Sequence, residues 1–381
     1  MSTEAFSKHF SDVQDPRQTA KISYPLFDVL FLSVCSVICG AEGWEEIQDF
    51  GEANLDWLQE KGLFIDGLPT HDTIARIVSR LDPSSFRRCF IRWTQSVSAR
   101  TSGELVAIDG KTLRRSYHRE DRQSAIHMVS AFASQNRVVL GQIKTEEKSN
   151  EITAIPDLLA LLDVTGCLVS IDAMGCQKSI AQTIVEKKAD YLLAVKGNQE
   201  TLYRSIKQAF AGRLAEPIEA NHLQIEKAHG RNEGRVCYVL PATDLTMQHP
   251  EWPELKTIGV VISYRQDRKS QKTTLEHRYY ISSAALEECE FAEAVRSHWG
   301  IENSLHWVLD ASMNEDGCPI FADHGAEILA TIRHIALNML RAETSKKASV
   351  RRKQKMACMS TDYLDKVWSA GVKILAEQSD E

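Results

Sequence analysis

The chain has 381 residues, of which 43% are hydrophobic and 25% charged, so it can bury two or three domains or one core with a large insertion. Its formal net charge of -7 argues against a uniformly basic surface for nucleic acid, so any contact with DNA must depend on local basic patches. The nine cysteines are an odd number without paired C-x-x-C spacing, which favours reduced thiols in a cytoplasm over a disulfide framework or a zinc ribbon.

The first 100 residues predict an all-helical N-terminal domain. The beginning of the chain lacks a charged region followed by a small-residue cleavage site, so we expect no signal peptide. The most apolar stretch, residues 26–38, is too short to span a bilayer and contains Asp28, which predicts a core helix. A later helix carries three arginines, and either a helix-turn-helix that binds DNA or a structural helical cap accounts for Arg87, Arg88 and Arg92.

From residue 104 the pattern changes to β-rich runs and then to alternating helices and strands. A polar turn at 134–136 joins the second and third runs and predicts a hairpin. A helix separates the third strand from the fourth, so the fourth can lie parallel to the first and beside it. The strands are expected at 105–108, 126–133, 138–143, 168–172 and 191–195, and the helices at 152–162, 180–188 and 200–211.

The rest of the chain divides into a β-rich part and a helical part. Short alternating runs indicate a β-rich insertion at about 215–285 within a catalytic domain that spans residues 101–345. Two long amphipathic helices are expected at 290–313 and 326–340. A helical tail at 346–381, basic and then acidic, begins with the cations Lys346, Lys347, Arg351, Arg352, Lys353 and Lys355.

Two of the expected strands end in an aspartate. Asp109 stands at the end of the run 104–108 and is followed by a basic turn, and Asp172 ends the run 167–171 before small residues. A single aspartate at such a place is usually a turn former or a helix cap. Because the two strands are expected to lie side by side, their carboxylates should meet at one edge of the sheet.

A third acid lies in the helix expected at 290–313. Residues four apart on a helix lie on one side of it, and this face carries His298, Glu302, His306 and Asp310. A solvated polar face is the plain explanation of such a line. Beside the two strand-end aspartates, Glu302 becomes the candidate third ligand, with Asp310 as its rival.

Three carboxylates without cysteines form a hard oxygen site, which suits Mg²⁺, or Mn²⁺ as a substitute, better than structural zinc. Two such ions per site can activate an attacking oxygen and stabilise a leaving oxygen during phosphodiester displacement. Basic residues around the aspartates then have a role as contacts to DNA phosphates. These residues are Lys111, Arg114, Arg115 and Lys196.

The chain carries five motifs: DGKTLR at 109–114, EKSNEITAIP at 147–156, DAMGCQ at 172–177, AVKGNQ at 194–199 and HWGIENSLHW at 298–307. In this order they resemble those of the H-repeat-associated insertion-sequence transposases of the DDE superfamily. The resemblance covers nearly the whole chain and implies a ribonuclease-H-like α/β fold with a mixed sheet flanked by helices. It also implies that Asp109, Asp172 and Glu302 are the catalytic, metal-binding triad, with the β-rich insertion between the second aspartate and the glutamate.

The resemblance further implies contacts to the DNA backbone from Lys196, Asn198, His229 and Arg231. The structural alternative for Lys196 and Asn198 is an ordinary strand-to-helix turn, and for His229 and Arg231 it is a hairpin tip. One departure concerns the glutamate, because the wider group surrounds it with Tyr-x₂-Arg-x₃-Glu-x₆-Lys. Here the Arg position holds His298, to which we assign the phosphate contact, with Arg296 as the alternative.

The sequence therefore predicts a transposase that binds double-stranded DNA at the inverted ends of its own element. It would cleave strands with metal-activated water and transfer them to target DNA, as a homodimer on DNA, in the bacterial cytoplasm beside the nucleoid and without a membrane. An inactive or domesticated copy that only binds DNA is the alternative. A zinc metallohydrolase that uses His298, Glu302 and His306 is a third hypothesis.

Overall fold

The computed structural model describes residues 3–98, 103–117, 125–145, 151–216, 224–228, 231–267, 270 and 272–373. The chain forms two compact units. The first comprises residues 1–100, 110–150 and 302–381, and the second residues 101–109 and 151–301. Two of the points at which the chain passes from one unit to the other are therefore the Asp109–Gly110 and Ile301–Glu302 peptide bonds. The expected boundaries between N-terminal domain, catalytic domain and tail stay a prediction.

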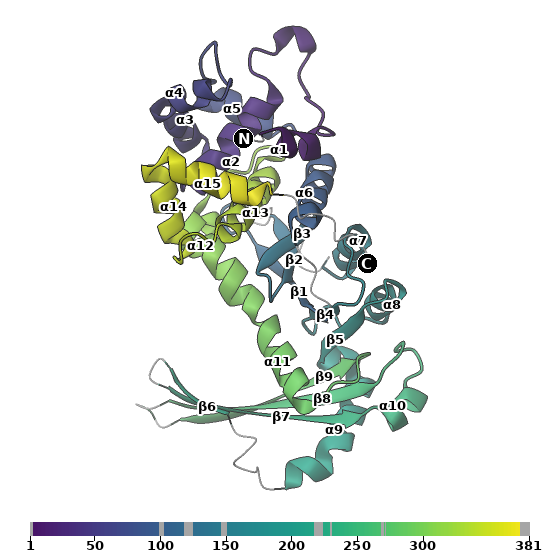
Figure 1. Ribbon diagram of the computed structural model, residues 1–381. Coiled ribbons are helices and arrows are strands. Elements are labelled where there is room, and N and C mark those ends of the chain that lie inside the picture. Colours follow the sequence, from purple (N-terminus) through teal and green to yellow (C-terminus); the bar gives the residue numbers. More distant parts are fainter. Residues whose placement is uncertain are drawn as a thin grey trace, which may run out of the picture. The chain divides into compact units, whose positions relative to one another are not determined.

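Helices form most of the first unit, and the predicted helical N-terminal segment is confirmed (Figure 1). Its N-terminal helices are α1 (Thr3–Phe10), η1 (Thr19–Lys21), α2 (Leu26–Ile38), α3 (Trp44–Ala53), α4 (Leu55–Glu60), α5 (His71–Val78) and α6 (Pro83–Val97). Its C-terminal elements are η6 (Glu302–His306), α12 (Trp307–Met313), η7 (Glu315–Gly317), α13 (Gly325–Ala342), α14 (Val350–Met359) and α15 (Thr361–Gly371). The helical character expected for the tail is confirmed by α14 and α15.

Helix α13 is the centre of the first unit, because it is buried along almost its whole length. It packs against α2, α6 and α15 and against strand β3. Polar bonds fix these helices in place: the Trp93 indole on α6 donates to the Gly371 carbonyl on α15 over 3.1 Å. An apolar helix of this length is stable in water only when other elements cover every side of it.

Strands β2 (His127–Ala133) and β3 (Val138–Thr145) form the predicted antiparallel hairpin. The register shifts between Ala131 and Phe132, so one residue of β3 is left over as a bulge. Beside this bulge, the side-chain amide of Asn338 on α13 forms two hydrogen bonds with the backbone of Val139. It accepts from the Val139 N–H over 3.0 Å and donates to the Val139 carbonyl over 2.9 Å. The helix therefore replaces hydrogen bonds that the bulge would otherwise leave unmade.

The second unit is built on one mixed sheet. Within it the strand order is β1-β4-β5-β9-β8-β7-β6, with β1, β4 and β5 parallel and the others antiparallel. The strands are β1 (Leu105–Thr112, of which 105–109 belong here), β4 (Leu168–Ile171), β5 (Asp190–Val195), β6 (Gln224–Ala228), β7 (Arg231–Pro241), β8 (Thr257–Asp267) and β9 (Thr273–Ser282). The helices are α7 (Glu151–Leu161), α8 (Lys178–Glu186), η4 (Gly197–Gln199), α9 (Glu200–Ala215), α10 (Thr243–Gln248) and α11 (Glu288–His298).

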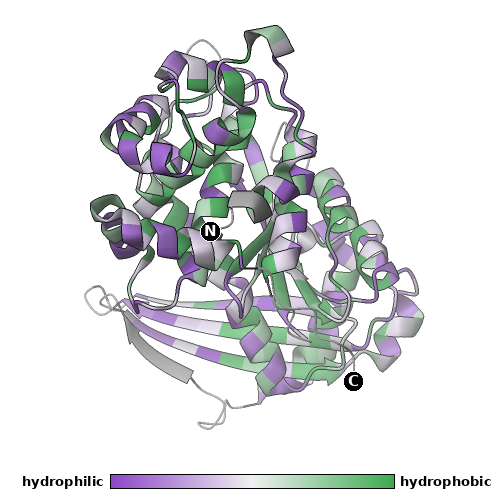
Figure 2. Cartoon of the chain, turned by 45° about the horizontal axis from the view of Figure 1, so that its top comes forward, coloured by the Kyte–Doolittle hydropathy of each residue, from purple (hydrophilic) through white to green (hydrophobic). Residues whose placement is uncertain are grey.

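The expected β-rich insertion extends this sheet, because β9 pairs directly with β5. Strands β8 and β9 are buried at the end near β5 and exposed at the other, and Figure 2 shows the matching change from apolar to polar residues. The predicted ribonuclease-H-like α/β fold, a mixed sheet flanked by helices, is confirmed. Among the described residues, no helix is long and apolar enough to cross a membrane.

Candidate active site

Asp109 and Asp172 directly follow the residues through which β1 and β4 pair in parallel; β1 itself continues past Asp109 to Thr112 instead of ending in the expected turn. Ile108 of β1 is the register partner of Ile171 of β4, and each aspartate is the next residue of its strand. Parallel strands present their carboxyl ends at the same edge of a sheet, so the two carboxylates leave neighbouring strands at one level. Both side chains are half-buried, as a site that must admit a ligand requires.

The turn after β4 fixes the carboxylate of Asp172. Its Oδ1 atom accepts hydrogen bonds from the backbone N–H groups of Met174, at 2.9 Å, and Gly175, at 3.2 Å. A Cβ atom on Gly175 would lie 2.2 Å from Cγ2 of Ile171, so this tight turn can hold only glycine at that position. The small residues after Asp172 therefore orient its carboxylate.

His298, at the end of α11, lies against strand β4. Its Nδ1 atom is 2.9 Å from Oγ of Ser170, which faces the same side of the strand as Asp172 two residues later. Burial lowers the pKa of His298, and the charge of Asp172 opposes this shift. The ring is therefore neutral at neutral pH and offers a hydrogen bond rather than a positive charge. Sequence reasoning did not identify Ser170.

A second turn supports the loop that follows Asp172. The Asn198 amide donates to the Ala173 carbonyl over 2.7 Å, and the Gln199 amide donates to the Cys176 carbonyl over 2.9 Å. Asn198, expected at the DNA backbone, thus has a bond within the protein. Gln199 supports the same loop, and the sequence analysis did not identify it.

Glu302 begins a π-helical turn in the first unit. One straight helix was expected over residues 290–313, but α11 ends at His298 and the turn η6 occupies Glu302–His306. A π-turn has more residues per turn than an α-helix, so the predicted line of residues four apart is not a regular α-helical stripe. Such turns occur frequently at functional sites.

The environment of Glu302 keeps its carboxylate ionised. The side chain is 61% exposed, and its Oε2 atom lies 3.2 Å from Nδ1 of the buried His306. The hydrogen bond with His306 and the charge of Lys111 hold the pKa of Glu302 below its ordinary value. The group is therefore a permanent anion at neutral pH.

Lys111 is enclosed by carboxylates of the first unit. Its ammonium group binds Asp310, lies 2.7 Å from Oε2 of Glu315, and lies 3.8 Å from Oδ1 of Asp316. Glu315 is buried, but the nearby positive charges of Lys111 and Arg333 outweigh the effect of burial and lower its pKa. Lys111, expected to contact phosphate, is thus the centre of an internal ion cluster, and Asp310, the rival third ligand, already binds a cation.

Comparison with known proteins places the chain among transposases. Residues 100–339 match the family described as "Transposase DDE domain", and residues 7–94 match "DDE_Tnp_1-associated". The chain belongs to the DDE transposase family. In Escherichia coli K12, "H repeat-associated putative transposase YhhI" is 46% identical over 371 residues, which cover 96% of this chain and 98% of that protein. In Escherichia coli O157:H7, "Putative transposase YncI" is 47% identical over 96% of this chain and 95% of that protein.

A third relative is much shorter than this DDE family member. "Inactive transposase YbfQ" of Escherichia coli K12 is 50% identical over 80 residues, which cover 21% of this chain and 95% of that protein. The resemblance drawn from the five sequence motifs is confirmed by the family match.

The other predicted DNA contacts of this family member differ in their surroundings. Arg114 is 80% exposed and lies 3.2 Å from Asp316, while Arg115 and Lys196 are exposed. Arg296 is exposed on α11. His229 lies outside the described residues, as do the first four residues of the motif at 147–156, and Arg231 is described only by its backbone at the start of β7.

The cations of the basic tail do not all lie at the surface. Lys353 of α14 is buried, where its ammonium group lies 3.7 Å from the Glu343 carboxylate and donates to the Leu340 carbonyl over 2.9 Å. Arg351, Arg352 and Lys355 are exposed. The helix therefore uses one of its cations to fold and keeps the others at the surface.

Proposed function

We propose that this DDE family member binds the inverted ends of its own insertion element and cuts and joins DNA strands there. Asp109, Asp172 and Glu302 would hold the metal ions. The observation that carries the proposal is the parallel register of Ile108 and Ile171, which puts two aspartates at the ends of adjacent strands. Membership of the transposase family supports the same reaction class.

The donor atoms suit a hard divalent cation. Asp109, Asp172 and Glu302 offer carboxylate oxygens, the ligands that Mg²⁺ and Mn²⁺ prefer. The backbone bonds to Oδ1 of Asp172 fix its orientation in advance, and the lowered pKa of Glu302 keeps that group charged. When bound, two Mg²⁺ ions, or Mn²⁺ in their place, supply activation of the attacking oxygen and stabilisation of the leaving oxygen.

The remaining roles fall to side chains of this chain. We assign Ser170 as the donor to Nδ1 of His298, 2.9 Å away; the ring proton is then on Nε2, which donates a hydrogen bond to a phosphate oxygen. Arg114, Arg115 and Lys196 are exposed and position the backbone of double-stranded DNA, first at the element ends and then at the target. Strand transfer at two ends requires two active sites, which we assign to a homodimer acting at the nucleoid.

The test is cleavage of a DNA duplex that carries the flanks of the gene itself by the purified full-length chain. We expect wild-type protein with Mg²⁺ or Mn²⁺ to release 3′-hydroxyl ends. Asp109→Ala, Asp172→Ala and Glu302→Ala should each abolish cleavage and leave DNA binding intact. Glu293→Ala is the matched control, because Glu293 is an exposed acid on α11, the helix of His298, and should cleave as the wild type does.

Two results would contradict the proposal. Cleavage that survives all three substitutions would show that the triad is not the metal site. Salt-dependent binding to the flanks without any cleavage in Mn²⁺ would instead identify a protein that only binds DNA.

A further inference from the structure

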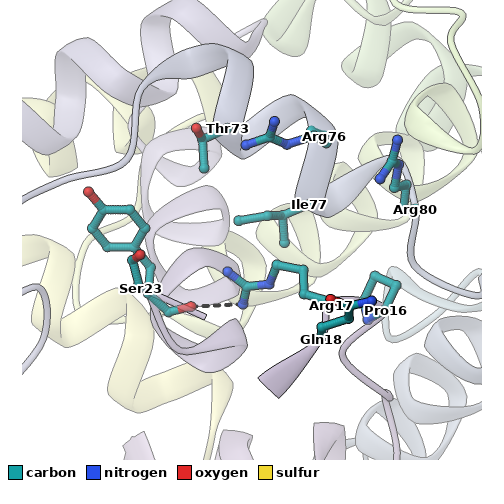
Figure 3. Close-up of a pocket in the computed structure, with 9 residues that line it drawn as sticks. Pro16, Arg17, Gln18, Ser23, Thr73, Arg76, Ile77 and Arg80 are labelled. Atoms are coloured by element: carbon teal, nitrogen blue, oxygen red, sulfur yellow. Dashed lines mark hydrogen bonds between the residues drawn. The ribbon is translucent and has the colours of Figure 1, made fainter. Parts of the chain in front are cut away.

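A cavity of 590 Å³ opens in the helical N-terminal region of the first unit (Figure 3). One wall is formed by residues of the segment 16–24, and the other by helix α5 and the turn that follows it. Its lining contains three arginines, Arg17, Arg76 and Arg80, and no carboxylate. The buried side chain of Ile77, which is 2% exposed, lies between the two walls.

The two arginines of the α5 wall have uncompensated charges. Arg76 and Arg80 are both exposed; Arg76 lies on α5, and Arg80 lies in the turn just after it. Within the described part of the chain, neither guanidinium takes part in an ion pair or a hydrogen bond.

The neighbouring helix α6, which the sequence marked as the basic one, differs in this respect. Arg92 lies 2.7 Å from Asp12, and Arg87 lies 3.9 Å from Glu327. The charges of these two arginines are offset within the protein, whereas Arg88 of the same helix donates to the Ser85 hydroxyl over 2.8 Å and lies outside the cavity lining.

Arg17 builds the opposite wall. Its Nε and Nη2 atoms donate to both oxygens of Asp15, at 2.8 and 2.6 Å, and Nη2 also donates to the Tyr24 carbonyl at 2.7 Å, the bond dashed in Figure 3. The Tyr24 hydroxyl in turn donates to the Leu68 carbonyl over 3.0 Å. Asp15 therefore balances the charge of Arg17, and this wall is held in a fixed position.

We propose that this cavity binds backbone phosphates of the element DNA through Arg76 and Arg80. A guanidinium presents several N–H donors in a fixed plane and matches the oxygens of a phosphate, so each of the two arginines at this cavity can bind one backbone phosphate. The hydroxyl of Thr73 and the amide of Gln18, both in the lining, add neutral donors. The assignment rests on the proposed function, because DNA is the substrate of that reaction.

The test measures binding of the full-length chain to the gene-flank duplex over a range of salt concentrations. Each phosphate contact contributes about 0.9 to the slope of log K against log salt concentration. Arg76→Gln with Arg80→Gln should therefore reduce the slope by about two and weaken binding on the order of 10-fold or more at 150 mM salt. Lys366→Gln, which removes an exposed cation of α15 outside the lining, is the control and should change the slope by less than about 0.5.

A gain-of-function variant distinguishes the loss of a phosphate contact from misfolding. Gln18→Lys places one more cation in the lining and should raise the slope by about one, which a protein that fails to fold cannot do. Inorganic phosphate and ATP serve as competing probes. Loss of their binding in the double variant with unchanged DNA affinity would overturn the proposal in favour of a free phosphate ligand.

The outcomes separate this proposal from the proposed function. If the wild type binds and cleaves the flanks and the double variant does so with the same slope, the cavity is not a DNA site and the transposase proposal stands. If the wild type neither binds nor cleaves the flanks, both proposals are wrong.

Discussion

The Nδ1 atom of His298 lies 2.9 Å from the Oγ atom of Ser170. This contact joins the end of α11 to strand β4 two residues before Asp172, within the second unit. A histidine held by one ring nitrogen has a defined orientation for the other, which is how ligand-binding and proton-donating histidines are usually supported. The bond therefore gives a geometric reason to assign His298 a part in the reaction.

His298→Ala should slow end cleavage by about 10- to 100-fold, the effect of losing a hydrogen bond to a charged group of about 1.5–3 kcal/mol. Ser170→Ala should slow it less, because the imidazole stays in place and loses only its orientation. Single-turnover cleavage of labelled DNA measures both rates, with the DNA affinity as a parallel measurement. Cleavage by His298→Ala at the wild-type rate would show that the histidine only packs against β4.

Lys111 is expected to stabilise the fold rather than to bind phosphate. Lys111→Met removes the cation 2.7 Å from the buried Glu315 and should lower the free energy of unfolding by about 3–5 kcal/mol, because it leaves a buried charge without its partner. Arg114→Met is the control, since an exposed ion pair contributes about 1 kcal/mol or less. Urea unfolding measures both changes.

A second substitution separates the two roles of Lys111. Lys111→Met combined with Glu315→Leu removes both charges and should recover most of the lost stability. A double variant as unstable as the single one would show that Lys111 acts through something other than this ion pair.

The close contact of α11 with the sheet depends on a glycine in β8. A Cβ atom on Gly259 would lie 2.4 Å from the ring of Phe291, so Gly259→Ala forces that ring to move and should cost about 1–3 kcal/mol of stability. The matched control is Gly212→Ala in α9, where a Cβ atom meets nothing within 4 Å. That change should be neutral or stabilise the protein by up to about 1 kcal/mol, because alanine favours a helix. In thermal melting, we expect a lower melting temperature than the wild type for Gly259→Ala and an unchanged or higher one for Gly212→Ala.

The sequence was sufficient to predict the pairing of β1 with β4, because both are apolar runs that lead into an aspartate and a crossover helix is expected between the third and fourth strands. It did not predict the ion cluster of Lys111, whose partners Asp310 and Glu315 stand about 200 residues away in the chain. Local sequence does not predict contacts between residues so far apart in the chain. A lysine next to a candidate active-site aspartate was therefore interpreted as a phosphate ligand.

The π-helical turn at Glu302 was missed for a different reason. Amphipathic spacing of three and four residues reports which side of a helix is apolar, and one extra residue in a turn changes that spacing very little. The histidine at position 306 was noticed because it follows Glu302 by four residues, and the two side chains do lie 3.2 Å apart. The pattern thus identified the pair of residues without revealing the backbone that brings them together.

His334 of α13 should make the stability of the protein depend on acid. The residue is 2% exposed, and burial lowers its pKa to about 4, with the charge of Glu315 opposing the shift. In the unfolded chain a histidine titrates near pH 6.5. Between these two values the unfolded state binds more protons than the folded state, so stability is fully present above about pH 6.5 and is lost as the pH falls towards 4.

His334→Phe should remove this dependence. Phenylalanine keeps the contact with the Phe90 ring, whose centroid lies 6.4 Å from that of His334, and it does not titrate. The free energy of unfolding of the wild type should fall by about 2.4 kcal/mol more than that of the variant between pH 7 and pH 4.5. His324→Gln, which changes an exposed histidine of the same segment, should keep the wild-type slope. If the His334→Phe and wild-type profiles run parallel in urea unfolding, the buried imidazole is not the group that senses acid.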